Sequence, residues 1–266
     1  MLSLEKPMKK PIVLAVAAHP DDVELMMSGT LARLGAAGAE IHIWTLANGC
    51  CGTNRLSREA ISRIRLQESR EAAALIGAVH HEPLFDDLAI FYDQPSLARV
   101  SAGLRAIRPD IVLTQSPNEY MEDHCNTCRL TVSAAFTRGI PNHVTVPPVP
   151  AYQAPVTVYH SIPYGLTDPL RRPVIPDYYV DVTTVMDTKW NMLACHRSQK
   201  EWLDVSQGMD SYLSEMKETC RRVGVRSGKF AFAEGWFRHS HLGFCGPEDD
   251  PLNNLLKENG YGTPNQ

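Results

Sequence analysis

One histidine and two aspartates stand directly after a hydrophobic segment. Residues 12–18 are apolar throughout, and His19, Asp21 and Asp22 follow them. Charged side chains at the end of a buried strand need a partner, because burying unpaired charge is costly. A metal ion is such a partner, since imidazole and carboxylate groups are common zinc ligands. His19 and Asp22 lie three residues apart where strand is expected to become helix, so both can reach one ion, and Asp21 remains free for proton transfer.

A second polar cluster follows another apolar segment, residues 111–114. It reads QSPNEYMEDH and ends in Asp123 and His124. In a doubly wound sheet of order 3-2-1-4 the first and fourth strands are neighbours, and ligands bind at the carboxyl ends of the strands. Two histidines and one carboxylate at such a crevice match a catalytic zinc site, whose fourth position holds water. We therefore expect a site for Zn²⁺, or for another divalent transition metal, between these two strands.

Two other interpretations of the first cluster explain less. Asp21 or Asp22 can cap the following helix, an effect typically worth about 1 kcal/mol, but capping leaves His19 and the second cluster unexplained. A Rossmann-type nucleotide site needs the glycines of G-x-G-x-x-G for close approach of the phosphates. The loop after the first apolar segment lacks these glycines, so we set this interpretation aside.

Composition indicates a globular chain that acts on a small molecule. The chain has 266 residues, 44% of them hydrophobic, and 26 basic residues against 30 acidic ones without long runs of like charge, which argues against nucleic acid as a partner. Its seven cysteines form no regular framework and suit a reducing compartment. No apolar run approaches the roughly 20 residues of a membrane span, and the first ten residues do not resemble a secretory signal. The predicted location is the cytoplasm.

The first half of the chain alternates strand and helix patterns. The apolar first strand is of the kind that is covered on both faces, and Ser57 and Pro95 are typical of helix starts. We expect strands at 12–18, 41–47, 78–82 and 111–114, with helices at 22–37, 57–76, 95–107 and 125–139. This alternation predicts an α/β fold with a mostly parallel sheet and right-handed crossovers.

The second half is less regular. Residues 139–155 carry five prolines and predict an extended loop or lid. Strands are expected near 156–159 and 178–182, and helices near 186–196 and 211–223. We treat residues 1–266 as a single domain with flexible tails at about 1–10 and 247–266.

The two polar clusters resemble a known family. The A-H-P-D-D segment, the later D-H before a helix, and KWNMLACHRSQ at 189–199 are similar to the de-N-acetylases, which include LmbE-like proteins and the enzyme that deacetylates N-acetylglucosaminyl-phosphatidylinositol (PIG-L). The resemblance implies a Rossmann-like three-layer sandwich, zinc held by His19, Asp22 and His124, and Asp21 as general base. It also implies that Arg65 reaches the substrate with support from Glu68.

One position departs from the family pattern. Many relatives carry a histidine three residues before the last ligand, thought to steady the oxyanion, but this chain has Met121 there. Methionine cannot donate a hydrogen bond, so the role is either absent or filled by another residue. The candidates are Tyr120, His196, His239 and His241. For Asp123 we expect a supporting role behind a metal ligand.

The resulting hypothesis is a metal-dependent amidohydrolase that removes the acetyl group from an N-acetylglucosamine-type amino sugar or its conjugate. Cleavage of another amide, such as a thiol conjugate, is a second hypothesis. A metal- or sugar-binding relative without catalysis is a third, supported by Met121. Relatives often assemble as trimers or hexamers, which leaves a homo-oligomer open.

Overall fold

A mixed sheet forms the centre of the molecule. The computed structural model describes residues 10–199, 212–256 and 261–262, and in these ranges eight strands pair in the order β3-β2-β1-β4-β5-β7-β6-β8. Strands β3 to β5 of that order are parallel, and the remaining pairs are antiparallel. The predicted order 3-2-1-4 is confirmed. The strands are Ile12–Ala17 (β1), Glu40–Thr45 (β2), Val79–His81 (β3), Ile111–Thr114 (β4), Thr157–Ser161 (β5), Tyr178–Asp181 (β6), Ala233–Arg238 (β7) and Tyr261–Gly262 (β8).

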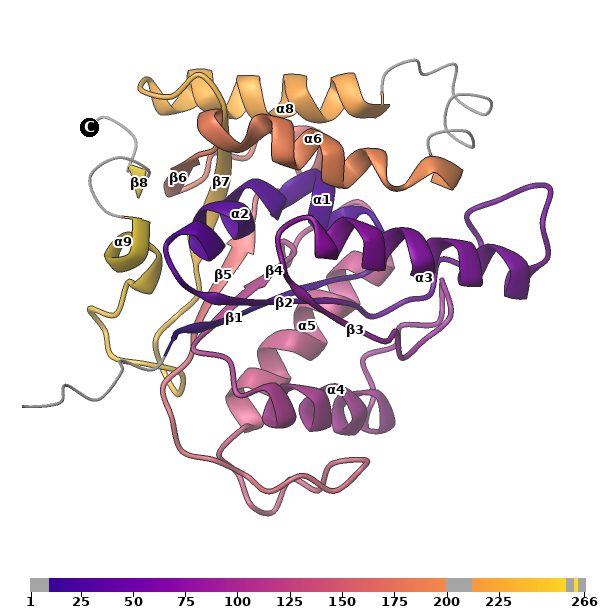
Figure 1. Ribbon diagram of the computed structural model, residues 1–266. Helices are drawn as coiled ribbons and strands as arrows, with labels where there is room; N and C mark the ends of the chain where they lie inside the picture. Colours follow the sequence, from indigo (N-terminus) through magenta and orange to yellow (C-terminus); the bar gives the residue numbers. More distant parts are fainter. Residues whose placement is uncertain (1–9, 200–211, 257–260, 263–266) are drawn as a thin grey trace, which may run out of the picture.

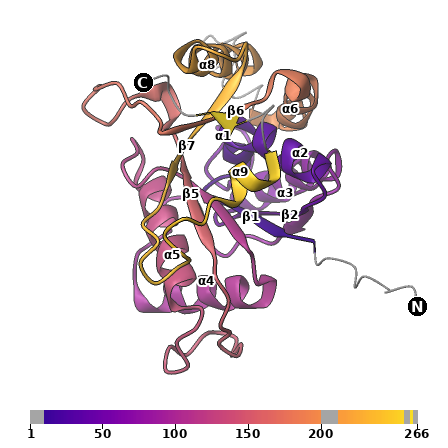
Figure 2. The ribbon, with the colours of Figure 1, turned by 90° about the vertical axis from the view of Figure 1, so that its left-hand side faces the viewer.

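Helices cover both faces of this sheet, as Figures 1 and 2 show in two views. One layer contains Asp22–Met26 (α1), Ser28–Ala36 (α2), Arg58–Ala74 (α3), Met186–Ala194 (α6) and Tyr212–Ser227 (α8). The opposite layer contains Gln94–Ile107 (α4) and Glu122–Thr137 (α5), while Pro251–Leu256 (α9) lies beside the sheet. Short 3-10 turns occupy Tyr164–Leu166 and Thr183–Val185. Within the described ranges, no helix combines the length and apolar character that crossing a lipid bilayer requires.

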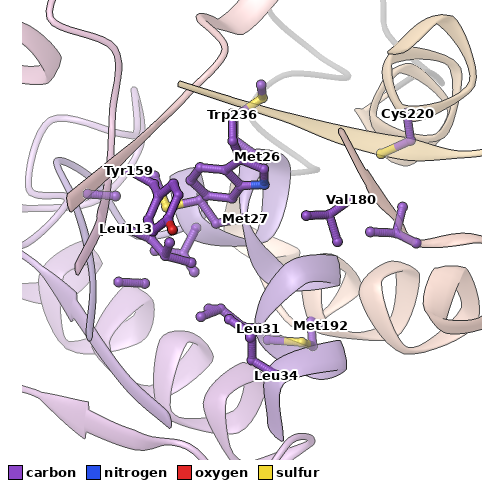
Figure 3. Close-up of a cluster of buried hydrophobic side chains, with 14 of the residues drawn as sticks. Met26, Met27, Leu31, Leu34, Leu113, Tyr159, Val180, Met192, Cys220 and Trp236 are labelled. Carbon is purple, nitrogen blue, oxygen red and sulfur yellow. The ribbon is translucent and has the colours of Figure 1, made fainter. Parts of the chain in front are cut away.

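The period of two along β1 divides the core between the two faces. Val13, Ala15 and Ala17 join the larger cluster, whereas Leu14 and Val16 join the cluster under α4 and α5. Figure 3 shows part of the larger cluster, which gathers side chains from distant parts of the chain, among them Met27, Leu31, Tyr159, Met192 and Trp236. The continuously apolar sequence of β1 thus has its cause in burial on both faces.

The helix expected over 22–37 is instead two helices, α1 and α2, that meet at Met27. The break is held from the C-terminal half of the chain. Lys189 in α6 donates to the carbonyls of Glu24 and Leu25 at 2.9 and 3.0 Å and to Glu234 Oε1 at 2.6 Å. Glu234 in β7 accepts the first backbone N–H groups of α2. The buried ion pair therefore satisfies the open ends of both helices.

Replacing Lys189 with methionine is expected to cost about 3–5 kcal/mol of unfolding free energy, because it leaves the buried Glu234 carboxylate without its cation. Urea denaturation measures this change. As a control, Arg221→Met breaks the exposed Arg221–Glu218 pair and is expected to change stability by less than about 1 kcal/mol. Equal small effects of both substitutions would contradict the structural role of Lys189.

Three other expectations change. Strand β7 was not predicted, because its glycine and mixed polar pattern resemble neither a helix nor an alternating strand. Part of the expected C-terminal tail packs instead: Leu252 and Leu256 of α9 are buried. The loop at 139–155 is extended but is not a lid, since it packs along α4 through Arg105 and contributes nothing to the described lining of the central cavity. The expected N-terminal tail, except for Lys10, lies outside the described residues.

Candidate active site

The two polar clusters meet at the carboxyl ends of β1 and β4, which pair in parallel. His19 and Asp21 lie in the turn after β1, and Asp22 begins α1. Helix α5 starts at Glu122, three residues earlier than expected, so Asp123 and His124 lie in its first turn and not in the preceding loop. The acidic residues of that turn favour the positive end of the helix, which explains the earlier start.

Three side chains gather their donor atoms at this point. Nitrogen atoms of His19 and His124 and a carboxylate oxygen of Asp22 all lie within 4.8 Å of one another. Asp22 Oδ2 is 3.5 Å from His19 Nδ1 and 3.4 Å from His124 Nε2. All three residues are buried. Two imidazoles and one carboxylate converge here, and among the described residues no cationic side chain lies between them. This donor set fits a divalent transition metal.

A carboxylate stands behind each imidazole. His19 Nε2 is 3.0 Å from Asp123 Oδ2, and His124 Nδ1 is 3.4 Å from Glu119 Oε2. Such partners fix the ring orientation of metal-binding histidines. Burial disfavours the imidazolium form of His19, but hydrogen bonds with Asp123 and Asp22 raise its pKa to about 10. The carboxylates of Asp22 and Asp123 thus favour positive charge here, and a bound cation can supply that charge in place of the imidazolium proton.

Asp21 faces the same space but is held by different partners. Its backbone has φ 109°, a left-handed conformation that strains a non-glycine residue. Tyr212 donates a hydrogen bond to Asp21 Oδ2 at 2.7 Å, and Arg65 Nη2 lies 3.4 Å from Asp21 Oδ1. Burial raises the pKa of Asp21, while the Arg65 charge opposes that rise. A carboxylate held in this way can accept a proton and return it.

Tyr212→Phe is expected to lower kcat by about ten- to a hundredfold, because a hydrogen bond to a charged group contributes about 1.5–3 kcal/mol. Steady-state kinetics with metal analysis test this, and the metal content should not change. Tyr92→Phe is the control, since Tyr92 bonds Ser133 on the surface and does not line the central cavity. Unchanged kcat in Tyr212→Phe would show that Asp21 does not depend on this bond.

The site lies in a cavity of about 350 Å³, at the small end of the range for small-molecule sites. Arg65 lines it, yet its guanidinium is already engaged by the carbonyls of Pro20 and Gly49 as well as by Asp21. Besides the charged groups, the wall contains apolar and aromatic side chains, namely Leu25, Met26, Leu88, Tyr120, Met121, Tyr164 and Tyr212. An acetyl-sized group can contact this wall.

Among the four residues proposed to replace the missing histidine, Tyr120 lines this cavity, and its ring meets that of His124 edge-on at 5.4 Å. His196 is fully buried behind the site, 3.3 Å from Glu24. His239 bonds His160 at another cavity, and His241 is exposed. Tyr120 is therefore the one of the four with direct access within a single chain.

The Glu68 carboxylate is engaged by Ser198 and not by Arg65, whose guanidinium is held by Pro20, Gly49 and Asp21. It accepts hydrogen bonds from the backbone and hydroxyl of Ser198, at 2.9 and 2.6 Å. This attaches α3 to the segment that follows α6, so Glu68 supports the cavity wall that carries Arg65 and Gln199 and does not hold the guanidinium itself.

Sequence reasoning missed three residues of the site: Gln115, Glu119 and Tyr212. Gln115 donates to Asp22 Oδ2 at 3.2 Å and accepts from the Ala18 backbone at 3.0 Å, so it joins β4 to the turn after β1. Gln115 and Glu119 stand in the polar cluster after β4 and could have been found there. Tyr212 gave no signal, because only the fold brings α8 to Asp21.

Comparison with known proteins agrees with this geometry. Residues 14–135 match the PIG-L family model, described as GlcNAc-PI de-N-acetylase. This match covers a little under half of the chain. The matched range contains His19, Asp22 and His124 with both supporting carboxylates, whereas Tyr212 lies beyond it.

Proteins similar to this chain have two different activities. Diacetylchitobiose deacetylase of Thermococcus kodakarensis is 26% identical over 232 residues, covering 84% of this chain and 81% of the relative. The 4-oxalmesaconate hydratase of Pseudomonas putida is 23% identical over 248 residues, covering 88% and 90%. The solved N,N'-diacetylchitobiose deacetylase from Pyrococcus horikoshii superposes with a TM-score of 0.72 at 23% identity, covering 87% and 84%. The last comparison establishes the common α/β fold.

Proposed function

We propose that this protein is a metal-dependent N-deacetylase that acts on an N-acetylglucosamine-type amino sugar or its conjugate. The observation that carries the proposal is the placement of Asp21 beside the three candidate ligands His19, Asp22 and His124, in one cavity. The PIG-L match and the Thermococcus deacetylase supply the reaction class.

In this proposal Asp21 transfers the proton, and its neighbours orient it and the substrate. Asp21 takes a proton from the attacking water and returns it to the leaving amine, so that acetate and a free amine result. Arg65 and Tyr212 hold the Asp21 carboxylate in place. Tyr120 is placed to donate its hydroxyl to the oxygen of the cleaved amide, in place of the histidine that Met121 replaces.

The bound metal would polarise the amide carbonyl and ease deprotonation of water. We propose zinc as this metal, because two neutral imidazoles and a carboxylate are typical of its catalytic sites. Asp123 and Glu119 keep the two imidazoles oriented. We further propose a cytoplasmic location, which the seven free cysteines favour. We also propose that the chain forms a single domain and assembles into trimers or hexamers.

An acetate-release screen over N-acetyl sugars, with elemental analysis of the purified protein, tests the function. The expected result is equimolar acetate and free amine, loss of both on treatment with a chelator, and recovery on adding Zn²⁺. The screen should include N-acetylglucosamine, diacetylchitobiose and an inositol conjugate, with an N-acylated thiol conjugate for the second hypothesis. Metal-loaded protein that releases no acetate from any of these would contradict the proposal and favour a relative without catalysis.

A second candidate function is addition of water to a carbon–carbon double bond. The match with the Pseudomonas hydratase covers 90% of that protein. In addition, Met121 stands where a histidine was expected to serve amide hydrolysis. Incubation with 4-oxalmesaconate, an unsaturated tricarboxylate, tests this through the loss of its ultraviolet absorbance. Absorbance loss without acetate release would favour the hydratase.

A further inference from the structure

A second group of potential metal ligands lies outside the three residues discussed so far. The loop at 48–54 carries adjacent cysteines, Cys50 and Cys51, and their donor atoms lie within 4.8 Å of each other and of an Asp87 carboxylate oxygen. Cys50 and Asp87 are buried, whereas Cys51 is exposed. The catalytic interpretation uses none of these side chains.

The separation of the two sulfur atoms favours a shared ion over a disulfide. Cys50 Sγ and Cys51 Sγ are 4.0 Å apart. Two zinc–sulfur bonds of about 2.3 Å at a tetrahedral angle place their sulfur atoms about 3.8 Å apart. A disulfide requires about 2.05 Å, so the loop would have to change to form one.

Asp87 holds the loop in this arrangement. Its Oδ1 accepts the Gly49 N–H at 2.7 Å and its Oδ2 accepts the Cys51 N–H at 2.8 Å. Each carboxylate oxygen has a second lone pair, so the carboxylate can hold the loop and still bind a cation. Gly49 has φ 76°, a conformation that suits glycine, and a Cβ there would lie 2.5 Å from Arg65 Cδ. The loop is therefore fixed from two sides.

We propose that Cys50, Cys51 and Asp87 form a second metal site, selective for thiophilic divalent cations such as Cd²⁺ or Zn²⁺. Binding replaces the two thiol protons with one cation, so two protons are released for each ion bound. Three protein ligands leave a coordination position for water or another small molecule.

This site adjoins the catalytic cavity. Cys51 and Asp87 line the same cavity as His19, Asp21 and His124, together with Gly52 of the loop. An ion at the cysteines occupies space on the cavity wall, so excess thiophilic metal is expected to inhibit turnover. This consequence for turnover rests on the proposed deacetylase function, whereas binding of the metal does not.

Titration of the full-length, zinc-loaded protein with Cd²⁺ tests the site, because a cadmium–thiolate bond has an ultraviolet charge-transfer band. We expect the band to saturate at one Cd²⁺ per chain. The double variant Cys50→Ser/Cys51→Ser should lose the band, while the matched variant Cys195→Ser/Cys245→Ser, changed at two cysteines outside both sites, should keep it.

Alkylation of the unmodified protein gives a test that does not depend on a variant folding. With Cd²⁺ at a hundred times its Kd, alkylation of Cys51 should slow by about a hundredfold, because the free thiol alone reacts. Mass spectrometry of the peptide that contains residues 48–54 measures this. An unchanged rate, or a band that survives in Cys50→Ser/Cys51→Ser, would overturn the proposal. Failure of acetate release alone would contradict the proposed function and leave the metal site standing.

Discussion

Asp21→Asn is expected to lower kcat by about 10²- to 10⁴-fold and to leave the metal content unchanged. The amide keeps the size of the carboxylate and can still accept the Tyr212 hydrogen bond, but it cannot take a proton from water. Steady-state kinetics and elemental analysis of the same preparation measure the two quantities. Loss of turnover without loss of metal separates the general base from the neighbouring ligand Asp22.

Asp187→Asn is the matched control, because Asp187 is exposed in the first turn of α6 and does not line the cavity. Its kcat should equal that of the unmodified protein. Full activity in Asp21→Asn would remove the general-base assignment, and loss of metal in that variant would make Asp21 a ligand.

His124→Ala is expected to abolish activity and metal binding at the site of His19, Asp22 and His124, because it removes one of the three candidate ligands. Glu119→Gln should be milder, since Glu119 lies behind His124 Nδ1: about a 10- to 100-fold weaker metal affinity, with activity restored by added metal. Metal titrations monitored by activity and by elemental analysis give both values. The graded pair distinguishes binding the ion from orienting the ligand.

His143→Ala serves as the control for histidine removal, because His143 bonds Ser101 far from the cavity lining. It should retain the metal content and the full activity of the unmodified protein. If His124→Ala retained a metal ion even when combined with Cys50→Ser/Cys51→Ser, the three-ligand site would be wrong, whatever the activity of the variant.

The parallel half of the fold was predictable because its signals are local. Apolar strands, the Ser57 cap and Pro95 each depend on a few neighbouring residues, and all appear in the structure near the expected positions. The break at Met27 was not predictable, because Lys189 and Glu234 lie far along the chain and hold it only after folding. Strand β7 was not predicted for a related reason, since its residue pattern reflects packing against β5 and β6.

The candidate site divides in the same way. His19, Asp21, Asp22 and His124 stand in two short polar clusters, and the expected strand order alone places these clusters side by side. Residues that act through contacts between distant parts of the chain lie outside such clusters, so no local sequence pattern identified them. Tyr212 reaches Asp21 across 191 positions, and Cys51 adjoins the cavity because Asp87, 36 positions later, binds its backbone. Their roles follow from tertiary packing and not from any local pattern.

The hydrogen bonds that Lys189 and Glu234 make at the break between α1 and α2 have a consequence for folding during synthesis. A ribosome delivers the chain from its N-terminus, so His19, Asp22 and His124 leave the exit tunnel well before Glu234. Until β7 has been synthesised, Glu234 is absent, and the first turn of α2 lacks the carboxylate that accepts its backbone N–H groups. The junction between α1, which begins at Asp22, and α2 is therefore not yet fixed. The side chains of the proposed metal site are thus synthesised early, but their arrangement is completed late. We expect a nascent chain stalled before residue 234 not to bind a metal ion at this site.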